Sequence, residues 1–261
     1  MVGILLMSFK ILISLYTLIL LSLNCAGSNL SESSNVQVRF EAGMKNLENG
    51  KYLKAQSDFQ YAVMRGAGTD IGDDAQYYLG EAFFLNKEYI LAIAEYEKLT
   101  RRMSYSPFVE KARFQICEAY RIESPKYYHD QEYTEKALER YQEFLEDFPS
   151  TTLKSDVLAS IENLREKLGM KLYETGILYT KLEEYDSAII TFQDVIDKYY
   201  DTKIIDEARK GMIIALAKNK DLKSAQIMLN EHKETLTDSG LFEDTKIKIE
   251  KIKKKSGKVE N

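Results

Sequence analysis

Cys25 is the residue whose type and position most clearly indicate a chemical modification of this chain. It follows Lys10 and an almost entirely apolar run over residues 11–23, and small residues come directly after it. A positive charge, an apolar run too short to span a bilayer comfortably and small residues at its end are typical of a cleaved export signal. A cysteine at the cut offers a thiol for acylation. We therefore expect residues 1–24 to be a signal peptide and Cys25 to be the lipid attachment site.

The residues around Cys25 resemble a relaxed lipoprotein signal. Ser22 stands where leucine is usual and Asn24 where a small residue is usual. The alternatives are an uncleaved anchor helix and an ordinary secretory signal cut elsewhere. Translation starts at Met1 or Met7. Residues 25–35 are polar and small, so we expect a lipidated, flexible tether.

The remaining residues of reactive type do not form a recognisable catalytic or metal site. Cys117 is the second of two cysteines and has no partner for an internal disulfide once Cys25 is acylated, so we expect it to be a small buried residue. His129 and His232 are far apart in the sequence and are expected at the surface. The sequence contains no phosphate-binding glycine loop, nucleophile elbow or metal-ligand spacing. We predict no catalytic residue, no metal and no cofactor, and hence no enzyme.

Composition favours a helical protein that does not bind nucleic acid. The net charge is −5, which argues against nucleic acid as a partner. There are three prolines and no tryptophan, and residues that favour helices are abundant.

An internal repeat organises the chain after the tether, and it is visible from its small residues. Five alanines align, and each is followed four residues later by a large apolar residue. The alanines are Ala55, Ala92, Ala137, Ala188 and Ala225; the residues after them are Phe59, Tyr96, Tyr141, Phe192 and Leu229. Glycine stands twelve residues before three of the alanines, at Gly43, Gly80 and Gly176. Small residues on paired helices let the backbones approach, and the large residue one turn along fills the space beside them.

The repeat resembles the tetratricopeptide (TPR) family, and Leu79-Gly80 with Tyr89, Ala92 and Tyr96 match it best. The resemblance implies an all-α fold, a right-handed superhelix of about five TPR-like helix pairs, over residues 36–235. The third repeat carries an insertion over residues 121–132. The fourth is expected to have a long first helix that bends at Gly169. Residues 236–261 are expected to be a basic C-terminal helix or tail.

Two segments resemble the BamD family of outer-membrane-protein assembly lipoproteins. One ends in Phe148-Pro149-Ser150 and the other in Tyr199-Tyr200-Asp201-Thr202. The resemblance implies a non-enzymatic scaffold on the periplasmic face of the outer membrane, anchored by its lipid. It also implies binding to a POTRA-bearing β-barrel insertase through the later repeats and to unfolded outer-membrane proteins through the earlier ones. The alternative is an envelope TPR lipoprotein that acts as an adaptor for cell-wall, division or Tol-Pal proteins.

In a TPR array the first helix of each pair lines a concave groove, and counting from the aligned alanines assigns residues to it. Aromatic residues would form a ladder beside carboxylates, which suits an extended segment with apolar side chains and a lysine or arginine. The predicted groove residues are Phe40, Tyr77, Glu81, Phe84, Phe114, Glu118 and Arg121. The alternatives are that the aromatics complete packing between repeats and that the carboxylates lie on a solvated face.

The C-terminal stretch is rich in lysine from Lys246 onwards, with Ile247, Ile249 and Ile252 between the lysines. One interpretation is a solvated, fraying helix whose lysines suit the negative end of its dipole. The other is a contact with anionic lipid or with an acidic partner.

Overall fold

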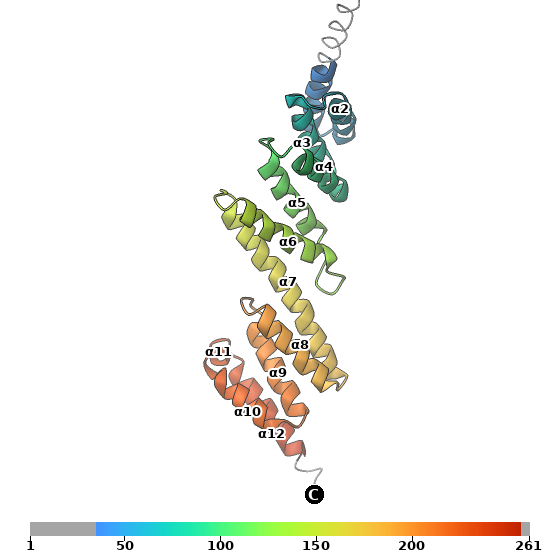
Figure 1. Ribbon diagram of the computed structural model, residues 1–261. Helices are drawn as coiled ribbons and strands as arrows, with labels where there is room; N and C mark the ends of the chain where they lie inside the picture. The colour runs from blue at the N-terminus through green and yellow to red at the C-terminus, as the bar shows by residue number, and fades with distance from the viewer. Residues whose placement is uncertain (1–34, 257–261) are drawn as a thin grey trace, which may run out of the picture. The chain divides into compact units, whose positions relative to one another are not determined.

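A computed structural model of the chain describes residues 35–256, and the regular structure there consists of α-helices joined by short turns (Figure 1). The predicted signal peptide, Cys25, most of the tether and residues 257–261 lie outside the described residues. The chain divides into two compact units, Met1–Ala119 and Tyr120–Asn261, and each is described by itself.

The first unit consists of consecutive helices that pack in pairs. A first helix, described over 35–48, is followed by α2 (Tyr52–Arg65), α3 (Asp70–Leu85) and α4 (Tyr89–Arg102). α3 packs against both α2 and α4. α5 (Val109–Glu123) begins in this unit.

The second unit continues the pattern of helix pairs. It contains α6 (Glu132–Asp147), α7 (Lys154–Lys181), α8 (Tyr185–Lys198), α9 (Ile205–Lys218), α10 (Leu222–Glu231), α11 (Lys233–Asp238) and α12 (Phe242–Ser256). Successive helices from α6 to α10 pack on one another. The prediction of an all-α repeat of helix pairs is confirmed, as is the long first helix of the fourth repeat.

α7 continues as a helix through Gly169, where the sequence suggested a bend. A Cβ atom added there would lie 3.2 Å from Ile204 Cγ2 and 3.3 Å from Tyr199 Cβ. The glycine thus allows the α8–α9 loop to approach α7 closely.

The recurring spacing of glycine and aromatic residues within the repeats has a direct structural cause. An added Cβ would lie 2.7 Å from Phe59 at Gly43, 2.5 Å from Tyr96 at Gly80 and 2.7 Å from Phe192 at Gly176. Contacts this short do not occur between real atoms, so the glycine is needed for the ring to lie on the helix. The sequence placed the large residue beside a pair of small ones, but the ring lies directly on the glycine.

The turns within the repeats share one backbone feature. Gly50, Lys87, Glu183 and Lys220 each stand five residues before an aligned alanine, and each has φ between 64° and 68°. In the second repeat, Glu88 N donates to Phe83 O at 2.9 Å and Lys87 N donates to Phe84 O at 2.9 Å. This pattern closes a helix with a left-handed residue, a position that favours glycine.

The links between repeats also follow a pattern, which the sequence analysis missed. Fourteen residues after an aligned alanine stands a hydroxyl residue, and its backbone N–H donates to the carbonyl three residues earlier at 2.9–3.1 Å. The four residues are Thr69, Ser106, Thr151 and Thr202. Serine and threonine favour such turns because their hydroxyls bond nearby backbone.

The C-terminal helix α12 corrects the expectation of a solvated, fraying tail. Ile249 is 6% exposed, and Ile252 and Phe242 are half-buried against a core that includes Ile213 and Leu229. α12 packs on α9, α10 and α11. The apolar side of α12 was difficult to recognise in the sequence, because it consists of a few positions spread over several turns and separated by lysines.

Candidate functional site

The predicted groove residues of the first unit lie in and around a cluster of aromatic rings. The Phe40 centroid lies 5.8 Å from that of Phe59 and 5.9 Å from that of Tyr78. Tyr77 stacks on Phe108 at 4.5 Å and meets Tyr78 edge-on at 5.3 Å. The cluster therefore joins the first helix, α2, α3 and the loop before α5.

Tyr77 is a packing residue in this cluster. Its side chain is only 8% exposed, and burial raises the pKa of its hydroxyl well above the usual value, with Glu81 adding to the shift. The packing alternative thus describes Tyr77, while Phe40 is half-buried at the edge of the cluster. Tyr78 and Phe108 were missed in the sequence, since neither falls on an aligned groove position.

Glu81 is engaged by neighbouring helices. Its Oε1 accepts hydrogen bonds from the Tyr96 hydroxyl at 2.5 Å and from Gln115 Nε2 at 2.8 Å. Tyr96 is fully buried, and its pKa is raised chiefly by that burial and further by the Glu81 carboxylate. Glu81 therefore ties α3 to α4 and α5, which neither the groove nor the solvated-face interpretation anticipated.

The other predicted groove residues are spread over α3 and α5. Phe84 is half-buried and meets Tyr89 edge-on, with 5.2 Å between ring centroids. Phe114 and Glu118 are half-buried on α5, and Arg121 is exposed near its end; all three have interactions with other residues. Their role in binding a partner stays a prediction.

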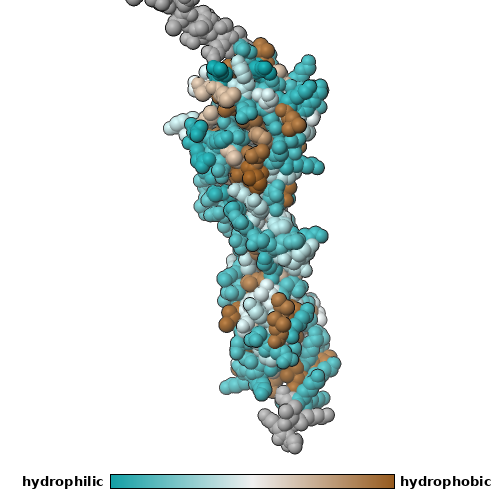
Figure 2. All heavy atoms as spheres, turned by 90° about the vertical axis from the view of Figure 1, so that its right-hand side faces the viewer, coloured by the Kyte–Doolittle hydropathy of each residue, from teal (hydrophilic) through white to brown (hydrophobic). Residues whose placement is uncertain are grey.

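Large apolar side chains are exposed on the first unit. Figure 2 shows hydrophobic residues gathered on the face of this unit that is turned to the viewer, between hydrophilic ones. Over the first unit as a whole, the large apolar side chains that are at least 40% exposed are Val38, Leu53, Met64, Leu85, Ile90, Leu91 and Tyr105. Contiguous exposed apolar groups commonly mark interaction surfaces.

The insertion in the third repeat forms a loop over residues 124–131, since α5 continues to Glu123 and α6 begins at Glu132. Gln131 is 4% exposed, and its Nε2 donates to the carbonyls of Lys126 at 2.9 Å and His129 at 3.0 Å. Its Oε1 accepts from the hydroxyl of fully buried Thr134 at 2.8 Å. A buried amide that satisfies several backbone groups gives the loop one defined shape.

Two lysines of α7 hold this loop from outside. Lys167 Nζ donates to Ser124 Oγ at 2.6 Å, and Lys171 Nζ donates to His129 O at 2.6 Å. At the tip, Tyr128 is 60% exposed and its ring lies 4.5 Å from that of His129. The loop thus presents an aromatic tip on a fixed base.

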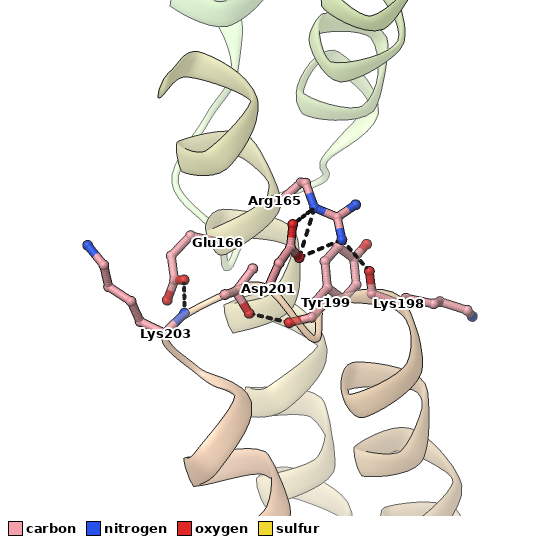
Figure 3. A network of polar contacts seen from close by, with 7 residues as sticks. Arg165, Glu166, Lys198, Tyr199, Asp201 and Lys203 are labelled. Carbon is pink, nitrogen blue, oxygen red and sulfur yellow. Dashed lines mark hydrogen bonds and ion pairs between the residues drawn. The ribbon is translucent and has the colours of Figure 1, made fainter. Parts of the chain in front are cut away.

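The segment Tyr199–Thr202 is fixed to α7 by Arg165 (Figure 3). Arg165 Nη2 donates to Asp201 Oδ1 at 2.7 Å and to Lys198 O at 2.6 Å, and Nε donates to both carboxylate oxygens of Asp201. The guanidinium also lies over the Tyr199 ring at 5.5 Å. Asp201 belongs to the segment that resembles the family motif, and in the structure its carboxylate is bound by Arg165.

We expect Arg165→Ala to lower the free energy of unfolding at neutral pH by about 1–2 kcal/mol, because it removes charge-assisted hydrogen bonds that solvent partly screens. The Arg165 hydrogen bond lowers the pKa of Asp201. A carboxylate whose folded pKa lies below the unfolded value stabilises the protein above the unfolded pKa, and the contribution disappears as pH falls through the folded pKa. Urea unfolding at several pH values should therefore show wild type and Asp201→Asn converging in acid. A difference that does not change with pH would contradict this assignment.

Within residues 35–256, no group of three His, Cys, Asp or Glu side chains is arranged to hold a metal ion. Cys117 is buried, as expected. Among the described helices, none is long and apolar enough to cross a membrane.

The repeated helix pairs, with a glycine under an aromatic ring in three of them, define a helical-repeat protein of the TPR class. The chain belongs to the YfiO family of outer membrane lipoproteins, whose model matches residues 32–236. It is similar to the outer membrane protein assembly factor BamD of Rickettsia prowazekii (strain Madrid E), with 24% identity over 200 residues, 72% of this chain and 77% of the relative.

Solved structures of TPR proteins are also similar. The P58(IPK) TPR domain aligns with a TM-score of 0.46 and 13% identity, covering 88% of this chain and 59% of that one. A thermophilic TPR protein of Thermus thermophilus aligns with a TM-score of 0.34 and 17% identity, covering 83% of this chain and 98% of that one.

Proposed function

We propose that this chain is a non-enzymatic scaffold of the machinery that assembles β-barrel proteins into the outer membrane. The observation that carries the proposal is the family match over 32–236, which includes nearly all of the helix pairs. The name of the Rickettsia relative, an outer membrane protein assembly factor, supports the same role. In this proposal Cys25 carries the lipid that anchors the chain to the periplasmic face.

The proposed partners are a POTRA-bearing β-barrel insertase and unfolded outer-membrane proteins. Stacked helix pairs provide extended surfaces for protein ligands. The exposed apolar side chains of the first unit suit unfolded clients, whose apolar residues are not yet buried. The later repeats are proposed to hold the insertase.

A pull-down of the tagged, acylated protein from its own membranes in mild detergent tests the role. We expect a stoichiometric POTRA-bearing β-barrel protein in the eluate. A variant with Cys25→Ser should no longer incorporate labelled palmitate. Recovery of Tol-Pal, division or peptidoglycan-linked proteins in place of the insertase would contradict the proposal and favour an envelope adaptor.

The client groove needs variants that leave the fold intact, and buried Tyr77 does not provide one. Phe84→Ala with Glu118→Gln changes two predicted groove positions that are half-buried, unlike Tyr77. We expect client affinity to fall about tenfold or more, because anchoring residues typically contribute over 1 kcal/mol each. Fluorescence titration with a denaturant-diluted barrel protein measures it.

Leu158→Ala with Glu162→Gln is the matched control, since both residues are exposed on α7 in the second unit and neither is a predicted groove position. Its client affinity should stay near wild type. The groove assignment would be contradicted if both double variants lost the same affinity for the client. It would also be contradicted if the groove variant kept its affinity while its unfolding midpoint was unchanged.

A further inference from the structure

Packing fixes which side of α12 faces outwards. Thr245 is fully buried, Ile249 is 6% exposed, and Phe242 and Ile252 are half-buried on the same side. This side packs on a core that includes Ile213, Leu229 and Leu236. α12 cannot turn about its axis without exposing these residues, so its opposite side is permanently presented.

Part of the outward side of α12 is basic and includes one exposed apolar residue. Lys248, Lys251, Lys254 and Lys255 are exposed, and Ile247 is 47% exposed. At 3.6 residues per turn these five positions fall within an arc of about 120°, with Ile247 inside it. We call these five residues the basic face.

Acidic residues lie within and beside the first part of the basic face, but α12 has no acidic residue after Glu250. Asp244 lies in the same arc, but it pairs with Lys248 at 2.8 Å and with Lys210 at 3.1 Å. At 3.6 residues per turn Glu243 and Glu250 fall just outside this arc, about 20° and 40° beyond Lys254, and they line a hollow of about 540 Å³ together with α10 and α11. Residues 251–255 hold four lysines and no acid, within a chain of net charge −5.

We propose that the basic face binds the surface of an anionic phospholipid bilayer. Lysines around an exposed aliphatic residue are typical of helices that lie on membranes. Lysine is depleted in protein–protein interfaces, which makes an acidic protein surface the weaker candidate. The helix dipole favours lysines in the last turn, but it does not account for Lys248 or for exposed Ile247. Membership of an outer membrane lipoprotein family places such a surface within reach.

This contact is separate from the proposed lipid on Cys25 and from the assembly role, and it would orient the second unit. Each lysine near an anionic surface strengthens binding about fivefold, so Lys251, Lys254 and Lys255 together amount to about a hundredfold. Because the attraction is electrostatic, it should weaken as salt is raised.

The test uses the full acylated chain in vesicles of phosphatidylcholine alone or mixed with phosphatidylglycerol. Ile247→Cys carries an environment-sensitive fluorophore, and Cys117 is buried and so protected from labelling. We expect a blue shift, and quenching by brominated lipid, in the anionic vesicles alone and at low salt. Changing Lys251, Lys254 and Lys255 to glutamine should reduce the ratio of bound to free label about a hundredfold.

The matched control changes Lys45, Lys51 and Lys54, three exposed lysines of the first unit, to glutamine. It removes the same charge and should leave the fluorescence response intact, with unfolding midpoints equal in all variants. Three outcomes would overturn the proposal. They are no response to phosphatidylglycerol, an equal response in neutral vesicles, and a response that appears only when a purified acidic envelope protein is added.

Discussion

Phe192→Ala is expected to lower the free energy of unfolding by about 3–5 kcal/mol, the range for truncating a buried aromatic residue. Phe192 is fully buried at the centre of a core that includes Ala188, Val195 and Ala208. Its ring lies between two glycines, on α7 and α9, and a Cβ added at Gly211 would lie 2.6 Å from it. The cavity could not close without moving both helices. Urea unfolding followed by circular dichroism measures the loss.

The contact with the glycines can be tested separately from burial. Gly211→Ala should cost about 1–3 kcal/mol, because the added methyl group overlaps the ring. In a double-mutant cycle with Phe192→Leu, the smaller side chain should relieve part of that cost, giving a coupling energy above about 0.5 kcal/mol. Strictly additive losses would show that the ring and the glycine do not constrain each other. Gly240→Ala is a useful comparison, since no atom lies within 4 Å of the added Cβ and only its φ of +73° opposes the change.

Gln131→Ala is expected to lower the free energy of unfolding by about 1–3 kcal/mol and to loosen the loop over residues 124–131, because each hydrogen bond that it removes contributes about 0.5–1.5 kcal/mol. The substitution removes three hydrogen bonds, to the carbonyls of Lys126 and His129 and from the hydroxyl of Thr134, although each of these groups keeps one other partner. Amide hydrogen exchange should accelerate in this loop more than in the cores of α8 and α9.

The control for this substitution is Gln193→Ala. Gln193 also donates through its side-chain amide, to Asp197 at 2.8 Å, but that hydrogen bond is exposed. Its loss should change stability by no more than about 0.5 kcal/mol. If both glutamine variants behave alike, the loop does not depend on its buried amide.

The helix positions of the predicted groove residues could be read from the sequence, but the partners of their side chains could not. Counting from the aligned alanines found Tyr77 and Glu81, because every repeat places equivalent residues on equivalent helix faces. It could not show that Phe108 stacks on Tyr77 or that Gln115 binds Glu81. Both partners come from outside the repeat to which Tyr77 and Glu81 belong, and their approach depends on how the repeats stack.

The sequence by itself determined the class of fold and the register of its repeats. A helix pair is a local structure, and the glycine under Phe59, Tyr96 or Phe192 stands sixteen residues before the ring in each case. Residue pairs at such short, constant spacing give the sequence a period that can be recognised without a structure. The left-handed turns at Gly50 and Lys87 also recur at a constant distance before the aligned alanines.

Only the tertiary structure decided which polar and apolar residues are available to a partner. Gln131 lies in an insertion for which the sequence predicted no side-chain environment, and it is buried, whereas one interpretation of α12 was a fraying tail and the helix packs through Ile249. Exposure of a side chain depends on neighbours that are distant in the chain. The sequence records the helix a residue belongs to, but the packing of other helices against it sets whether water or protein surrounds it.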